Sequence, residues 1–207
     1  MALRYLALGD SYTIGEGVAP EDRWPAQLVW ALRRTGFELD DPQIIATTGW
    51  TTDELDAGID AAAPQGPFDL VTLLIGVNNQ YRGRSLDEYR TQFSALLQRA
   101  LGFAGQRAHR VLVLAIPDWG VTPFAAASGR DLAQIARELD AYNAAAAEAC
   151  ASQGVTFIDT TIVNREFGGQ PDMLTDDGLH PSANMYTHWY MHAYPAAARQ
   201  LAIEVLP

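Results

Sequence analysis

Hydrophobic residues along the chain gather into five short runs that are separated by longer segments of mixed character. The runs occupy residues 3–8, 44–46, 70–75, 111–116 and 155–158. Several of them lack the alternation of apolar and polar residues that a half-exposed strand shows, which is typical of strands buried on both faces. The sequence therefore predicts five strands in the interior of a sheet.

The segments between these runs carry apolar residues at the three- and four-residue spacing of a helix face. Three stripes of this kind contain Trp24, Leu28, Ala31 and Leu32, then Leu86, Tyr89, Phe93, Leu96 and Leu97, and finally Leu132, Ile135, Leu139, Tyr142 and Ala146. Alternating strands and helices join by right-handed crossovers, which make the sheet parallel and put helices on both faces. We therefore expect an α/β fold, a three-layer α/β/α sandwich with a five-stranded parallel sheet of flavodoxin-like type.

Composition and charge narrow the class of protein further. The 207 residues, 48% of them hydrophobic, suit one globular domain, which we expect to span residues 1–207. A formal net charge of −11 makes nucleic acids and anionic membrane surfaces poor partners, because both are polyanions. Cys150 is the only cysteine, so no intramolecular disulfide can form. With no apolar run long enough to span a bilayer and no signal-like N-terminal segment, we expect a cytoplasmic protein without stable membrane insertion.

Four short motifs, far apart in the chain, carry the residues that are suited to chemistry. They are Gly9-Asp10-Ser11, Gly49, the segment Gly76-Val77-Asn78-Asn79, and Asp177-Gly178-Leu179-His180. Three of the four stand directly after a predicted strand. Ligand sites of open α/β sheets lie beyond the carboxyl ends of the strands, so the position of these motifs agrees with a functional role.

The first and last motifs together contain a nucleophile, a base and a carboxylate. Ser11 at a strand end exposes a hydroxyl, and the spacing of Asp177 and His180 lets the carboxylate bind one imidazole nitrogen while the other faces outward. Taken singly, Ser11 is equally a turn residue or a helix N-cap, and Asp177 a capping residue. Only their combination favours nucleophilic catalysis.

Gly49 and Asn78 supply donors of the kind that stabilise an oxyanion. A glycine after a strand allows close approach of its backbone to a ligand, and an asparagine side chain donates through its NH₂ group. Each is more often an ordinary turn residue when it occurs alone. The sequence contains no motif of a catalytic metal site. The pair His188 and His192 is better explained by packing or solvent exposure. We therefore expect neither a metal nor a cofactor.

Together the four motifs resemble those of the SGNH hydrolase family, the GDS(L)-type esterases and lipases. They occur in the family's order, although Tyr12 stands where many members carry leucine and Asn79 where many carry aspartate. The resemblance implies Ser11 as nucleophile, His180 as base and Asp177 as its partner. It also implies an oxyanion hole formed by the N–H groups of Ser11 and Gly49 and the side chain of Asn78.

Other hydrolase and cofactor motifs fit the sequence less well. No Gly-x-Ser-x-Gly elbow of an α/β-hydrolase occurs, and Gly15-x-Gly17 lacks the further glycine and the acidic residue of a dinucleotide site. The expected activity is hydrolysis of small carboxylic esters, with short acyl chains, through an acyl-enzyme. An acyltransferase, a lysophospholipase or a thioesterase with the same site remains an alternative.

Aromatic residues in loops near the predicted site are candidates for shaping the substrate pocket. They are Trp50, Tyr81, Trp119, Phe124 and Phe167. Each ring could equally cover the edge of the core. The loop from Trp119 to Arg130 is the only long one near the site and is mixed in character, which favours a shallow site for short acyl chains.

Overall fold

A computed structural model describes residues 2–203 of the chain, and this part contains one five-stranded sheet. The strands are β1 (Tyr5–Gly9), β2 (Gln43–Ala46), β3 (Leu70–Leu74), β4 (Val111–Leu114) and β5 (Thr156–Ile158). All pairs are parallel and the order is β2-β1-β3-β4-β5. This is the flavodoxin-like order, so the predicted fold class is confirmed.

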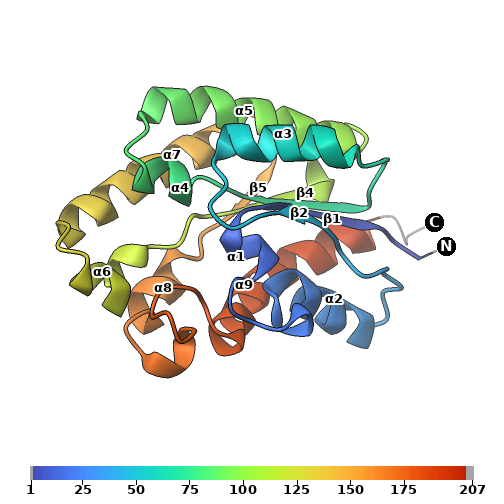
Figure 1. Ribbon diagram of the computed structural model, residues 1–207. Helices are drawn as coiled ribbons and strands as arrows, with labels where there is room; N and C mark the ends of the chain where they lie inside the picture. Colours follow the sequence, from blue (N-terminus) through green and yellow to red (C-terminus); the bar gives the residue numbers. More distant parts are fainter. Residues whose placement is uncertain (1, 204–207) are drawn as a thin grey trace.

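Helices cover both faces of the sheet and complete the three layers (Figure 1). One face carries α3 (Thr52–Ala62), α5 (Leu86–Phe103) and α7 (Leu132–Ser152). The other carries the short α1 (Ser11–Ile14), α2 (Trp24–Arg34) and α9 (Ala183–Ala202), and α2 packs along α9. The three predicted stripes lie on α2, α5 and α7, where most of their residues are buried; Ala31 and Leu86 are half-buried and Leu132 is exposed.

Besides the short α1, α4 (Val77–Tyr81) and α6 (Pro123–Ala127), three longer helices, α3, α8 (Thr161–Phe167) and α9, have no counterpart among the predicted stripes. In α3 the buried apolar side chains are only Leu55 and Ile59, and α8 is short. The buried face of α9 combines large aromatic residues such as Trp189 with alanines, and the helix contains Pro195. A stripe of mixed residue sizes gives a weak periodic signal, because hydrophobicity alone does not separate alanine from the polar face.

The strands β1, β3 and β4 are buried along their whole length. Polar groups among them are paired; the Tyr5 hydroxyl, for example, lies 2.9 Å from the Thr72 hydroxyl. The edge strand β5 is only partly buried. Burial on both faces explains why the central strands show no polar alternation in the sequence.

The carboxyl ends of the strands meet at one edge of the sheet, and short elements gather there. They are α4 (Val77–Tyr81), the 3₁₀ turn Trp119–Val121 and α6 (Pro123–Ala127), on the left of Figure 1. The side on which the next strand is added reverses between β1 and β3: β2 lies beside β1 on one side and β4 beside β3 on the other, and the helices that follow β1 and β3 lie on opposite faces. Such a switch point leaves a crevice for a ligand. Among residues 2–203, no helix is both long and apolar enough to cross a membrane.

Candidate active site

The turn after β1 carries Ser11, the predicted nucleophile. β1 ends at Gly9, Asp10 caps the following helix by accepting the N–H of Tyr12 at 3.0 Å, and Ser11 is the first residue of α1. The chain is packed tightly here: a Cβ on Gly9 would lie 2.6 Å from the Leu74 carbonyl oxygen and 2.1 Å from the Thr13 hydroxyl. Gly9 therefore has to be a glycine, because the end of β1 lies too close to the end of β3 and to Thr13 for a side chain.

Asp10 is fully buried beneath this turn. Burial raises the pKa of its carboxyl to about 7, although the N–H groups of Tyr12, Gly76 and Asp10 itself act in the opposite direction. Gly76 is the N-cap of α4, which follows β3. Asp10 thus binds the turn after β1, and the backbone of Gly76 after β3 acts on its pKa, a role that the sequence did not reveal.

The loop before α9 places Asp177 against His180. One carboxylate oxygen of Asp177 lies 2.6 Å from Nδ1 of His180, and the other accepts the backbone N–H groups of Leu179 at 2.8 Å and His180 at 2.9 Å. The loop is closed by the N–H of Thr175, which donates to the His180 carbonyl at 2.8 Å. Two intervening residues, Gly178 and Leu179, therefore suffice to bring one carboxylate to the imidazole ring and fix it.

The hydrogen bonds in this loop favour the ionised form of Asp177. Partial burial of the carboxyl opposes ionisation, but the donors from His180, Leu179 and Thr175 outweigh it and lower the pKa from 3.8 to about 2. The imidazole side chain is only 13% exposed. A carboxylate that stays charged can hold the ring in one tautomer, with Nδ1 as the donor.

The loop after β2 contains Gly49, and α4 contains Asn78. Gly49 has a φ of +87°, a conformation that favours glycine. Asn78 donates through Nδ2 to the carbonyl of Trp50 at 2.9 Å. Because an amide nitrogen carries two hydrogens, this bond leaves the second hydrogen for a ligand.

These residues line one pocket at the carboxyl edge of the sheet, with a volume of about 230 Å³. Its polar lining residues are Ser11, Thr48, Gly49, Asn78 and His180, and its remaining lining residues are Tyr12, Val77, Tyr81, Trp119, Phe124 and Leu179. Asp177 lies behind His180 and does not line it. The structure thus brings residues of all four distant motifs to one cavity and places the Asp177 carboxylate directly behind His180.

Three of the predicted aromatic residues form one wall of this pocket. Trp119 is buried and donates to Gln80 at 2.9 Å, with the rings of Tyr81 and Phe124 at 5.4 and 6.2 Å from its ring. Tyr81 and Phe124 are 41% and 36% exposed. Trp119 therefore forms the fixed part of the wall, and the other two rings form its rim.

Trp50 and Phe167 do not reach the pocket. The indole of Trp50 lies across α3 at Gly58, where an added Cβ would meet it at 2.2 Å, so only its carbonyl faces Asn78. Phe167 stacks on His188 at 4.9 Å between ring centroids. The loop that contains Trp119 is also more ordered than expected, since it forms a 3₁₀ turn followed by α6.

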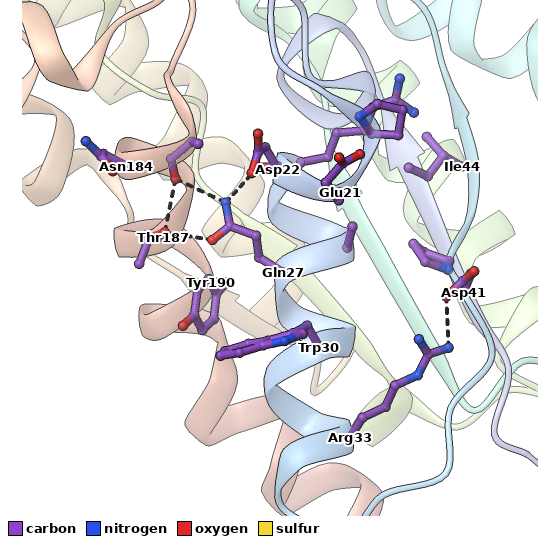
Figure 2. Close-up of a pocket in the computed structure, with 15 residues that line it drawn as sticks. Glu21, Asp22, Gln27, Trp30, Arg33, Asp41, Ile44, Asn184, Thr187 and Tyr190 are labelled. Atoms are coloured by element: carbon purple, nitrogen blue, oxygen red, sulfur yellow. Dashed lines mark hydrogen bonds and ion pairs between the residues drawn. The ribbon is translucent and has the colours of Figure 1, made fainter.

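A larger hollow of about 950 Å³ lies over the outer face of α2, away from these motifs (Figure 2). Its polar groups hold elements together: Gln27 donates to the carbonyls of Asp22 and Ala183, and Arg33 pairs with Asp41 at 2.9 Å. It contains no residue of the four motifs. Within residues 2–203, no cluster of three or more His, Cys, Asp or Glu side chains is arranged to hold a metal ion.

Two residues support the pocket from behind, Asn79 of the third motif and Arg82, which the sequence did not single out. Asn79 is fully buried; it accepts the N–H of Thr52 at 3.1 Å and donates to the Thr52 hydroxyl at 2.7 Å. Arg82 donates to the Gly49 carbonyl at 2.6 Å. Asn79 was part of the third motif, whereas a lone arginine after that motif gave no signal for Arg82.

The model of the GDSL-like lipase/acylhydrolase family matches residues 7–188. The chain belongs to this family. It is accordingly a carboxylic ester hydrolase. Comparison with curated protein sequences finds no match.

Solved structures of similar fold include several hydrolases of this kind. TesA has a TM-score of 0.73 at 19% identity, over 95% of this chain and 99% of that one. The psychrotrophic esterase EstA from Pseudoalteromonas sp. has a TM-score of 0.72 at 17% identity, over 96% and 98%. Axe2, an acetylxylan esterase from Geobacillus stearothermophilus, has a TM-score of 0.65 at 20% identity, over 100% and 99%. At these identities the likeness establishes the shared fold.

Asp177→Asn tests the ionised carboxylate through its effect on stability. Because the pKa in the folded state lies below the unfolded value, ionisation of Asp177 stabilises the fold above pH 4, and this contribution is lost as the pH falls from 4 toward 2. The difference in free energy of unfolding between the wild type and Asp177→Asn should therefore shrink over that range. Urea titrations at several pH values measure it. Asp176→Asn, which removes the adjacent exposed carboxylate, is the control, and a constant difference for Asp177→Asn would contradict the prediction.

Proposed function

We propose that the protein hydrolyses carboxylic esters of short acyl chains through an acyl-enzyme on Ser11. The observation that carries the proposal is the convergence of Ser11, Gly49, Asn78 and His180 on one small pocket, with Asp177 2.6 Å from the imidazole. A hydroxyl, a base with an oriented ring and donors beside them are the requirements of nucleophilic acyl transfer.

In the first half of the reaction, Oγ of Ser11 attacks the ester carbonyl carbon and its proton passes to Nε2 of His180. The carbonyl oxygen becomes an oxyanion, which the N–H groups of Ser11 and Gly49 and the Asn78 amide stabilise. The carbon–oxygen bond to the alcohol then breaks, and His180 returns the proton to the departing alkoxide. The ionised Asp177 stabilises the imidazolium that exists between these proton transfers.

In the second half, water attacks the acyl-enzyme by the same route. His180 accepts a proton from the water, the oxyanion forms again at the same donors, and collapse releases the carboxylic acid while Ser11 regains its proton. Ser11, His180 and the oxyanion donors thus each act once in each half of the cycle. The oxyanion hole therefore acts in both halves of the cycle, because a negative oxygen develops in each.

The size and lining of the pocket support short acyl chains. Its volume of about 230 Å³ is below the roughly 300–1,000 Å³ of drug-sized ligand pockets. Apolar side chains from Val77, Trp119 and Leu179 suit a hydrocarbon group, but the exposed rings at the rim open directly to solvent. Axe2, of the same fold, is an acetylxylan esterase, which is consistent with an acetyl-sized acyl group here.

Ser11→Ala should abolish nearly all ester hydrolysis and leave the fold unchanged, since the hydroxyl forms the covalent bond. The test is turnover of p-nitrophenyl acetate, with circular dichroism as the check on folding. EstA is inhibited by monoethylphosphonate. An activated ethylphosphonate ester should therefore label the wild type, with Ser11 Oγ displacing the leaving group from phosphorus, and peptide mass spectrometry should locate the adduct at Ser11. Near-wild-type turnover of Ser11→Ala, or an adduct at another residue, would contradict the proposal.

Asn78→Ala should lower kcat by on the order of 10²- to 10³-fold with little change in KM, because this donor acts when oxyanion charge develops. Steady-state kinetics on p-nitrophenyl acetate measure both constants. Asn184→Ala is the matched control: it removes an exposed asparagine amide in the hollow of Figure 2. A change confined to KM would mean that Asn78 binds the ground-state substrate and would refute its place in the oxyanion hole.

Substrate preference should peak between acetyl and about hexanoyl esters. Each methylene buried in an apolar groove contributes up to about 0.8 kcal/mol, whereas a methylene beyond the pocket rim remains in water and contributes almost nothing. The measurement is kcat/KM for p-nitrophenyl esters from acetyl to palmitoyl, below micelle-forming concentrations, with Ser11→Ala as the blank. A maximum at dodecanoyl or longer would refute the short-chain assignment and favour a lysophospholipase or thioesterase.

A further inference from the structure

We infer that Arg82 is a positioning residue for the oxyanion hole, acting on the backbone of Gly49. This inference rests on the proposed function, because it takes the Gly49 N–H as an oxyanion donor. Arg82 follows the C-terminus of α4 and does not line the pocket. Its guanidinium donates to the Gly49 carbonyl at 2.6 Å through Nη2 and to Glu54 Oε1 at 3.2 Å through Nη1.

Arg82 is one of three side chains from the α4 region that hold the loop after β2. Asn78 donates to the carbonyl of Trp50, and Asn79 binds both the N–H and the hydroxyl of Thr52. The carbonyl of Gly49 is bound by Arg82. The loop from Gly49 to Thr52 is thus attached to α4 through its own polar groups, and Gly49 is held by the arginine.

The conformation of Gly49 explains why this contact affects the donor. A glycine with φ of +87° has no side chain to restrict its rotation, and an added Cβ here would meet nothing closer than Arg82 Nη2 at 3.8 Å. Side-chain packing therefore does not fix Gly49. The charged hydrogen bond from Arg82 holds the peptide group between Gly49 and Trp50, whose N–H also donates to the Thr47 carbonyl at 3.2 Å. Loss of the arginine bond loosens this peptide group, and the Gly49 N–H, which is joined to it through the two backbone torsions of the glycine, loosens with it.

The position of the guanidinium is itself fixed. Its second partner, Glu54, accepts the backbone N–H of Thr51 at 2.8 Å in the capping box of α3. Arginine can bind the Gly49 carbonyl and this carboxylate together through its planar fork, whereas lysine offers a single point charge. The chain therefore connects the first turn of α3 to Gly49 through one side chain.

Arg84 provides a matched control two residues along the chain. It also joins the segment after α4 to the first turn of α3, with Nη1 at 2.6 Å from Asp53, and it pairs with Glu88 at 3.1 Å. Its guanidinium binds these two carboxylates and does not reach Gly49 or Trp50. Loss of either arginine removes a surface ion pair with α3, but only loss of Arg82 releases Gly49.

The experiment compares Arg82→Ala, Arg82→Lys and Arg84→Ala with the wild-type protein on p-nitrophenyl acetate. Arg82→Ala should lower kcat by about tenfold or more with KM within about twofold, Arg82→Lys should lie between it and the wild type, and Arg84→Ala should keep kcat within about twofold. Urea unfolding of all variants separates the loss of kcat from a loss of stability. If Arg82 had a purely structural role, Arg82→Ala and Arg84→Ala would lower the free energy of unfolding and kcat alike. The 43% exposed side chain of Arg82 leaves the core intact in either variant.

Each outcome bears on one hypothesis. Equal kcat for Arg82→Ala and Arg84→Ala would overturn the role of Arg82, and so would a loss confined to KM, because Arg82 would then contact the substrate itself. If Ser11→Ala is inactive while Arg82→Ala keeps wild-type kcat, only this inference fails. If Ser11→Ala remains active, the proposed function fails whatever Arg82 does.

Discussion

The parallel pairing of β1 with β3 is the constraint on which the rest of the site depends. Its register sets Gly9 beside Leu74, so both strands end at the same level. The chain then leaves toward opposite faces of the sheet, and Ser11 and Asn78 stand on the two sides of the crevice. The buried carboxyl of Asp10 accepts the N–H of Tyr12 after β1, and the backbone of Gly76 after β3 acts to lower its pKa. The proposed nucleophile and side-chain donor thus rest on the most buried part of the molecule.

The other two motifs reach the pocket by different means. The loop containing Gly49 is held to α4 by side-chain hydrogen bonds, whereas the loop containing Asp177 and His180 is closed on itself by its own backbone and carboxylate. A self-contained turn needs only the right short sequence. A loop held by side chains from another element needs those elements to be in place, so its geometry is the part of the site most sensitive to remote substitution.

The wall of the pocket comes from segments outside the motifs. Trp119 is fixed by Gln80, while Tyr81 carries the Arg130 guanidinium 4.1 Å above its ring. The fold persists among neighbours at 17–20% identity. Because the fold supplies the strand ends and the loops supply the rim, chains of this fold can differ in substrate without a change in architecture.

The sequence alone determined the fold class and the order of the motifs, because periodic apolar runs and short contiguous motifs are local features of a chain. It also indicated the Asp177–His180 pair, whose geometry is built within four residues. Only the tertiary structure decided that Trp50 turns onto Gly58 instead of the pocket, that Asp10 is buried at the strand ends, and that Arg82 holds Gly49. These features depend on how separate elements pack against one another, and no spacing in the sequence encodes that packing.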